Sequence, residues 1–121
     1  MNETKTTDET KTFREINRDE LRKKVERGDK FHLWDARTEQ YFSGEVIQGA
    51  KWVPADQLEK KLPALGAEKS DEIVVYCSSV TCPASKSEAK QLSQLGFSNV
   101  SVYESGLADW KEAGLPTQKA A

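Results

Sequence analysis

The fold is decided by residues 73–95, which read Ile-Val-Val-Tyr-Cys-Ser-Ser-Val-Thr-Cys-Pro-Ala-Ser-Lys-Ser-Glu-Ala-Lys-Gln-Leu-Ser-Gln-Leu. The first four residues are β-branched or aromatic, which is typical of a short strand buried on both faces of a sheet. In the last third of the stretch, apolar residues recur at helical spacing, namely Ala89, Leu92 and Leu95. The segment therefore predicts a strand, a loop and a helix, with Cys77 at the carboxyl end of the strand.

The rest of the chain repeats this alternation of strands and helices. Strands are predicted at residues 13–16, 31–36, 50–53 and 100–103, and helices at 17–28, 58–65 and 107–113. Residues 38–49 are expected to be irregular, with at most a short helix at 39–43, and Pro63 is expected to end or kink its helix. The pattern predicts an α/β fold, a small parallel five-stranded sheet flanked by helices on both faces.

Length and composition favour one globular domain. With 121 residues, 36% hydrophobic and 31% charged, the chain can bury a core without disulfide support. Residues 1–12 contain no apolar segment and are predicted to be a disordered N-terminal tail. The domain is expected to span residues 13–117, with 118–121 as a C-terminal tail.

Charge and cysteine content exclude several function classes. A net charge of −2 provides no basic surface for nucleic acid, and the longest apolar runs are far too short for a membrane span. Two cysteines without a secretory signal indicate a reducing, cytoplasmic location. A single histidine, His32, and no clustered ligands argue against a metal site, and no cofactor is expected.

Cys77 is the candidate nucleophile. Loop amides and the positive end of the following helix dipole favour a thiolate at this place, whereas an ordinary cysteine has a pKa near 8.5. The alternative is an inert buried thiol. Cys82, five residues on, is either a small apolar loop residue or a resolving thiol that attacks a modified Cys77 and closes a disulfide.

Three further segments carry a family resemblance. They are Leu33-Trp34-Asp35-Ala36-Arg37, Gly44-Glu45-Val46-Ile47-Gln48-Gly49-Ala50 and Ser105-Gly106-Leu107-Ala108-Asp109-Trp110-Lys111-Glu112-Ala113-Gly114-Leu115-Pro116. In this order, and with Val75-Tyr76-Cys77 between them, they resemble the signatures of the rhodanese-homology domain, the fold of single-domain sulfurtransferases. Glu45 stands where the family usually has histidine, and Ser105 replaces a glycine.

The resemblance implies a sulfurtransferase or persulfide relay. Cys77 would take sulfane sulfur from a small donor (thiosulfate, a polysulfide or a protein persulfide) and pass it to an acceptor thiol or cyanide. The active loop and helix start would bind the substrate with Ser78, Ser79, Val80, Thr81, Pro83, Ala84 and Ser85. Asp35 and Arg37 are expected to form a salt bridge that supports the mouth of the site.

The loop departs from the family pattern in ways that bear on the donor. The family loop commonly ends in a basic residue, but Cys82 occupies that neighbourhood here, and the nearest cation is Lys86. Activity on thiosulfate is therefore an open question, and Lys86 would have to fold back to help. Val80 stands near a glycine position, where a positive φ would strain a β-branched residue.

Two other functions remain open at this point. A thiol–disulfide redox switch would use Cys77 and Cys82 without sulfane chemistry, and a non-catalytic interaction module would use neither. Related phosphatases and arsenate reductases need an arginine at the end of a longer loop, and this loop has none.

Overall fold

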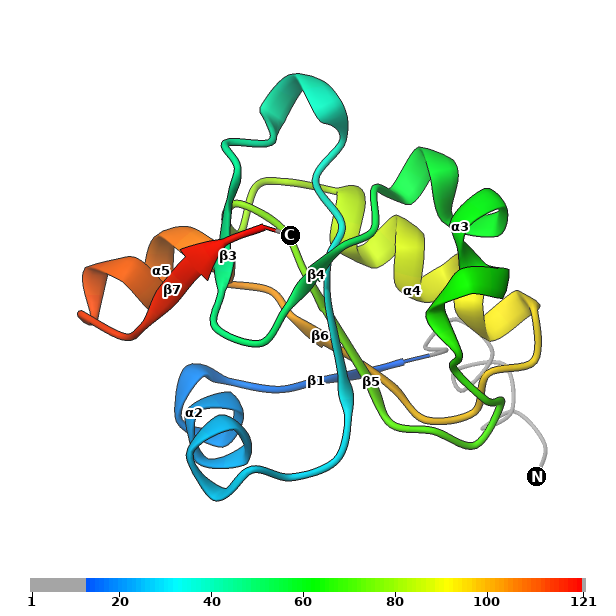
Figure 1. Cartoon of the computed structure of the whole chain (residues 1–121), viewed down its shortest axis with the longest axis horizontal. Coiled ribbons are helices and arrows are strands. Elements are labelled where there is room, and N and C mark those ends of the chain that lie inside the picture. Colours follow the sequence, from blue (N-terminus) through cyan, green and yellow to red (C-terminus); the bar gives the residue numbers. More distant parts are fainter. Residues whose placement is uncertain (1–12, 121) are drawn as a thin grey trace, which may run out of the picture.

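A central parallel sheet organises the computed structural model, which describes residues 13–120 (Figure 1). Its strand order is β1-β6-β5-β2-β4, and all four pairings are parallel. The strands are β1 (Arg14–Glu15), β2 (His32–Asp35), β4 (Lys51–Trp52), β5 (Ile73–Tyr76) and β6 (Val100–Tyr103). The predicted α/β fold with a five-stranded parallel sheet is confirmed.

Helices cover both faces of this sheet, as predicted. They are α2 (Arg18–Arg27), α3 (Leu58–Leu65), α4 (Ala84–Gln94) and α5 (Gly106–Glu112). One core cluster joins α2 and α5 to the sheet through Leu21, Leu107 and Trp110. The other joins α3 and α4 to the opposite face through Leu58, Ala89 and Leu92. In Figure 1, α2 and α5 accordingly lie on one side of the strands and α3 and α4 on the other.

Local sequence explains where the first helix begins and ends. The side chain of Asn17 accepts a hydrogen bond from the Glu20 amide, and the Glu20 carboxylate accepts one from the Asn17 amide. This reciprocal capping box satisfies two amides that the helix itself leaves unpaired. Gly28 ends the helix in the left-handed conformation that glycine adopts without steric cost.

Pro63 does not end α3, which was one of the two outcomes expected for it. The helix continues to Leu65 and ends at Gly66. A proline removes one intrahelical hydrogen bond. Here Pro63 lies near the end of a short helix that Leu58 anchors in the core.

A second, two-stranded sheet was not predicted. Residues 38–49 contain the 3-10 turn η1 (Glu39–Tyr41) and strand β3 (Glu45–Ile47), which pairs antiparallel with β7 (Thr117–Lys119). The domain thus extends beyond residue 117, and the prediction of a C-terminal tail at 118–121 is wrong for residues 118 and 119. Short strands whose partner lies about seventy residues away have no local signature. The predicted tail at 1–12 lies outside the described residues.

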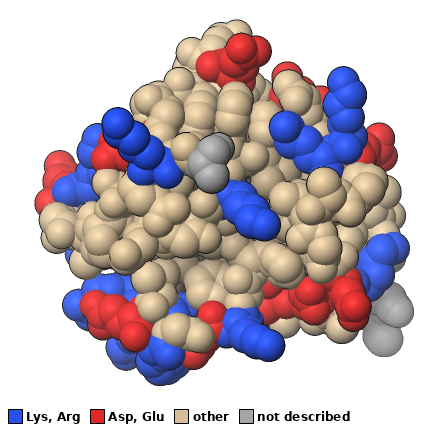
Figure 2. All heavy atoms as spheres, in the orientation of Figure 1, with Lys and Arg blue, Asp and Glu red and all other residues tan. Residues whose placement is uncertain are grey.

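Charges are mixed on the surface. On the face shown in Figure 2, basic and acidic side chains are interspersed, without one continuous basic stripe. Within residues 13–120, no helix combines the length and apolar character needed to cross a bilayer.

Candidate active site

Cys77 lies where the sequence placed it, directly after β5 at the carboxyl end of the parallel sheet. Strand β5 occupies the middle of the sheet, between β2 and β6. The Ala36 amide donates to the Tyr76 carbonyl at 2.8 Å, so the end of β2 lies beside the cysteine. Ligands of open parallel sheets bind at this edge, which makes it the candidate site.

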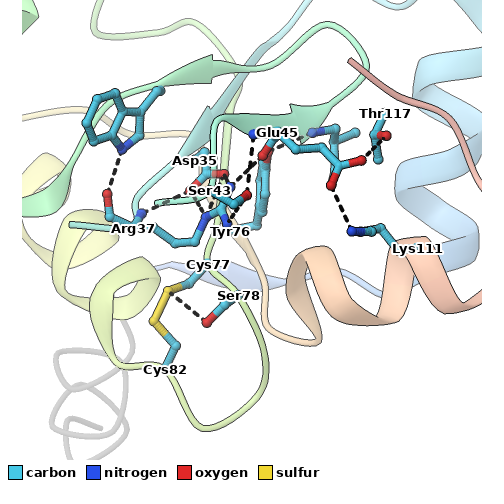
Figure 3. A network of polar contacts seen from close by, with 12 residues as sticks. Asp35, Arg37, Ser43, Glu45, Tyr76, Cys77, Ser78, Cys82, Lys111 and Thr117 are labelled. Carbon is cyan, nitrogen blue, oxygen red and sulfur yellow. Dashed lines mark hydrogen bonds and ion pairs between the residues drawn. A yellow bond between two sulfur atoms is a disulfide. The ribbon is translucent and has the colours of Figure 1, made fainter. Parts of the chain in front are cut away.

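Cys77 and Cys82 are joined by a disulfide bond (Figure 3). Their Cα atoms are 6.2 Å apart, a separation that such a bond spans readily. Cys77 is 0% exposed, whereas Cys82 is partly exposed. The pairing that the sequence left open is therefore present in the structure, and the two thiols belong to one unit.

The expected ring of amides around the Cys77 sulfur is not present in this oxidised form. Within the described chain, the one hydrogen-bond contact of this sulfur is with the Ser78 hydroxyl, at 4.0 Å. A disulfide sulfur carries no negative charge, so it does not organise donors as a thiolate would. The loop groups pair among themselves instead: the Cys82 amide donates to the Ser79 carbonyl, and the hydroxyls of Ser79 and Thr81 lie 3.1 Å apart.

Val80 stands at the tip of the loop and is 61% exposed. No non-glycine residue among those described has a positive φ, so Val80 is not strained. The loop, closed by the disulfide, follows a path that does not need a glycine there.

The start of α5 holds the loop from behind. The amides of Leu107 and Ala108 donate to the carbonyls of Cys77 and Ser78, each at 2.9 Å. Gly106 makes this approach possible, because a Cβ at its position would lie 2.6 Å from the Cys77 carbonyl oxygen and 2.9 Å from the Ser79 nitrogen. Sequence reasoning did not select Gly106 as a site residue, although it belongs to the quoted Ser105–Pro116 segment.

Asp35 and Arg37 form the expected salt bridge beside the loop. The guanidinium donates to the carboxylate, with Nη2 at 2.6 Å and Nε at 3.0 Å. Nη2 also donates to the Glu45 carbonyl, and Arg37 is only 3% exposed. The indole of Trp52 donates to the Arg37 carbonyl at 2.7 Å. Arg37 is fully engaged inside the protein and supports the site rather than facing a ligand.

Tyr76 links this salt bridge to β3. Its hydroxyl accepts a hydrogen bond from the Ile47 amide at 2.9 Å. Burial, together with the charge of Asp35, raises the pKa of the Tyr76 hydroxyl far above its ordinary value. Tyr76 therefore stays neutral and acts as a structural bridge under the site.

The remaining predicted residues surround the start of α4. Ser85 is buried, Ala84 is half-buried and Pro83 is exposed at the N-cap. Lys86 does not fold back over the loop, because its ammonium group pairs with Glu104 at 2.8 Å. That hydrogen bond raises the pKa of Lys86.

Glu88 is a buried carboxyl of α4 that was not predicted from the sequence. It is 0% exposed, on the buried side of α4, and neither carboxylate oxygen has a hydrogen-bond partner. Burial, and secondarily the charge of Asp35, raises the pKa of this carboxyl well above its ordinary range. The available signal was its position next to Ala89 on the apolar stripe of the helix.

No histidine or metal cluster contributes to the site. His32 lies at the opposite end of β2, where its ring pairs with Asp71 at 3.0 Å. Across residues 13–120, no group of three or more His, Cys, Asp or Glu side chains could hold a metal ion.

The fold and the cysteine position match one family. The model of the rhodanese-like domain matches residues 17–113. The chain belongs to this family. Among the curated proteins compared with it by sequence, none matches.

Solved structures agree with that assignment. The rhodanese-like domain is similar to the Alr3790 protein from Anabaena sp., at 28% identity and a TM-score of 0.75, covering 87% of this chain and 92% of that one. The solution structure of the rhodanese-like domain of Alr3790 is 30% identical, with a TM-score of 0.69 and coverage of 87% and 78%.

A named enzyme shares the fold at lower identity. A thiosulfate sulfurtransferase from Pseudomonas aeruginosa is 19% identical with a TM-score of 0.71, and the match covers 90% of this chain but 21% of that one. At this identity the likeness concerns the fold alone.

Proposed function

We propose that this rhodanese-like domain is a sulfurtransferase or persulfide relay in which Cys77 carries the sulfur and Cys82 is its resolving thiol. The observation that carries the proposal is the Cys77–Cys82 bond at the carboxyl edge of the sheet. Cys82 lies within bonding distance of Cys77, so its thiol can attack a persulfide that forms on Cys77. The family assignment supports the sulfurtransferase chemistry.

The proposed reaction has two steps. The Cys77 thiolate attacks the outer sulfur of a donor R–S–SH, the S–S bond of the donor breaks, and R–S⁻ leaves while Cys77 becomes a persulfide. An acceptor thiolate or cyanide then attacks the outer sulfur and releases Cys77. When no acceptor arrives, Cys82 attacks the inner sulfur, which expels HS⁻ and forms the Cys77–Cys82 disulfide.

The charges around the loop favour a protein persulfide donor over thiosulfate. Residues 78–85 contain no Lys or Arg. Two cations near the loop are already ion-paired: Arg37 with Asp35, and Lys86 with Glu104. A doubly charged thiosulfate would thus meet no unpaired cation from these residues, whereas sulfur transfer from a protein persulfide does not depend on a cation in the loop.

The disulfide also favours a second candidate function, a thiol–disulfide redox switch. In that case Cys77 and Cys82 would cycle between dithiol and disulfide without carrying sulfane sulfur. A cytoplasmic location would make the bond transient, because glutathione holds this compartment at roughly −220 to −320 mV.

Intact mass spectrometry separates the two functions. The reduced protein is incubated with a polysulfide and, in parallel, with thiosulfate. The relay predicts an added mass of about 32 Da on Cys77. This adduct should be absent in Cys77→Ser and longer-lived in Cys82→Ser, which cannot expel the sulfur. If the wild type closes the disulfide while Cys82→Ser takes up no sulfur, the switch is supported and the relay is overturned.

A further inference from the structure

The two sulfurs of the disulfide differ in their access to solvent. Cys77 is 0% exposed, whereas Cys82 is partly exposed, in a loop whose tip residue Val80 is 61% exposed. A thiolate that reduces a disulfide must reach one of the two sulfurs, and the other sulfur leaves with the electron pair of the broken bond. A thiol that arrives from solvent therefore meets Cys82 first, and Cys77 becomes the leaving group.

The leaving sulfur has one polar neighbour among the described residues, the hydroxyl of Ser78 at 4.0 Å (Figure 3). A sulfur in a disulfide carries no proton, so the hydroxyl is the donor in this contact. The contact is long while the sulfur is neutral, but a thiolate accepts charge-assisted hydrogen bonds, which are shorter and stronger. Between residues 13 and 120, the sulfur of Cys82 has no comparable donor. The hydroxyl of Ser78 is thus placed to stabilise a negative charge on Cys77.

Helix α5 holds Ser78 and Cys77 together independently of the disulfide. The amides of Leu107 and Ala108 donate to the carbonyls of Cys77 and Ser78, each at 2.9 Å. Neither of these hydrogen bonds involves Cys82, so opening the disulfide leaves both of them in place. The Ser78 hydroxyl therefore stays beside the Cys77 sulfur when the bond to Cys82 breaks.

We propose that an external thiol reduces the Cys77–Cys82 disulfide by attacking Cys82, and that the Ser78 hydroxyl stabilises the Cys77 thiolate that leaves. The thiolate RS⁻ forms a bond to the Cys82 sulfur, the disulfide bond breaks, and its electron pair goes to the Cys77 sulfur. A second RS⁻ attacks the R sulfur of this mixed disulfide, so that RSSR leaves and Cys82 is released as a thiolate, which takes a proton from water. Two thiols are oxidised to RSSR, and the protein gains the two electrons.

This order of attack rests on the proposed role of Cys82 as the resolving thiol, and it adds how the site is reset. Attack at Cys82 produces the Cys77 thiolate in the first step, and the thiolate is the form that takes up sulfane sulfur. Attack at Cys77 would instead leave the reductant bound to the nucleophile until a second thiol arrived. The exposed cysteine thus receives the reductant while the enclosed cysteine becomes free to react.

The first test is the position at which the reductant becomes attached. The oxidised protein is mixed with glutathione, quenched in acid early in the reduction, digested with pepsin and mapped by mass spectrometry. About nine-tenths or more of the mixed disulfide is expected on Cys82. A mixed disulfide mainly on Cys77 would overturn the proposal. A parallel reaction with reduced thioredoxin, at equal thiolate concentration, shows whether a small thiol or a protein thiol is the faster reductant.

The second test is the rate of reduction by glutathione in serine variants. Ser78→Ala removes the hydroxyl from the leaving sulfur, so its rate should be about threefold or more below that of the wild type. Ser78→Thr keeps a hydroxyl and should restore most of the rate. Ser87→Ala, which changes an exposed serine of α4, is the matched control and should react at the wild-type rate. Equal rates for Ser78→Ala and Ser87→Ala would contradict the role of Ser78.

A titration separates a hydrogen bond to the thiolate from a merely structural effect of Ser78. In Cys82→Ser, Cys77 is the single remaining thiol, and its ultraviolet thiolate absorbance can be followed against pH. Adding Ser78→Ala to this variant should raise the pKa of the Cys77 thiol by about one. An unchanged pKa would mean that the hydroxyl does not bind the thiolate, and the proposal would be overturned even if Ser78→Ala altered the loop.

The outcome is separable from that of the proposed function. If Cys77 never takes up sulfur, but glutathione attaches to Cys82 and Ser78→Ala slows the reduction, the relay fails and the order of attack stands. If the sulfur adduct forms but glutathione attaches to Cys77, only the present inference fails.

Discussion

Gly106 lies in α5, but its effect falls on the loop that carries the nucleophile. Its φ is +71°, and a methyl group there would press on the backbone of Cys77 and Ser79, which no flexible side chain can relieve. We expect Gly106→Ala to lower the free energy of unfolding by about 2 to 3 kcal/mol. It should also shift the carbonyls that the α5 amides hold, and slow sulfur uptake by Cys77. Urea unfolding and the mass assay measure the two effects.

Gly114→Ala is the matched control for this prediction. Gly114 has nearly the same φ, +75°, but nothing lies within 4 Å of its added Cβ. The unfolding free energy of Gly114→Ala should fall only by the cost of an alanine in the left-handed conformation, about 1 kcal/mol, and its sulfur uptake should be normal. Equal losses in the two variants would mean that the close approach of Gly106 to the loop has no energetic weight.

Asp35 and Arg37 act at the same scale, through a buried ion pair. Both side chains are almost fully enclosed, so removing one charge leaves the other unpaired in a low-dielectric surrounding. Asp35→Asn is expected to cost about 3 to 5 kcal/mol, measured from the urea midpoint at an unchanged m-value. The double variant Asp35→Asn with Arg37→Met should be less destabilised than the sum of the single variants, and strict additivity would contradict the pairing.

At the scale of elements, the disulfide ties the end of β5 to the start of α4. It closes a loop with a sequence separation of five, for which the chain-entropy model gives about 2 kcal/mol of stabilisation. Oxidised wild type should therefore exceed Cys82→Ser in unfolding free energy by about this amount. Reduced wild type and Cys82→Ser should be nearly equal. A variant as stable as the oxidised protein would show that the bond does not constrain the unfolded chain.

Element prediction succeeded where the signal was local. Strand β5 was predicted from the apolar run Ile73 to Tyr76, and α4 from the apolar stripe of Ala89 and Leu92. Both patterns can be recognised because they involve residues that are close together in the sequence. Strands β3 and β7 were missed because their pairing joins distant parts of the chain. The same limit applies to the site: Cys77 was found from its strand, whereas the contact of Gly106 with the loop and the burial of Glu88 depend on the packing of α5 and α4.

At the scale of the whole molecule, two glutamates give stability a pH dependence of opposite sign. Hydrogen bonds from Lys111, and then Thr117, lower the pKa of Glu45, which joins β3 to α5 and β7. The ionised Glu45 carboxylate therefore stabilises the folded protein. This stabilisation is complete above the ordinary glutamate pKa, about 4.3, and is lost as the pH falls through the lower pKa that Glu45 has in the folded state. Acid should therefore loosen the small sheet, and Glu45→Gln should remove this part of the acid sensitivity.

Glu88 acts in the reverse direction, because its pKa is raised in the folded protein. Above pH 4.3 or so, the unfolded chain has released this proton while the folded protein still holds it. Unfolding then releases a proton, so stability falls as the pH rises toward the folded pKa, by up to about 1.4 kcal/mol per pH unit. The difference in unfolding free energy between Glu88→Gln and wild type, from urea titrations of the oxidised proteins at pH 5, 6 and 7, should grow in favour of the variant. A difference independent of pH would mean that Glu88 is ionised in the fold, and its burial as a protonated acid would have to be abandoned.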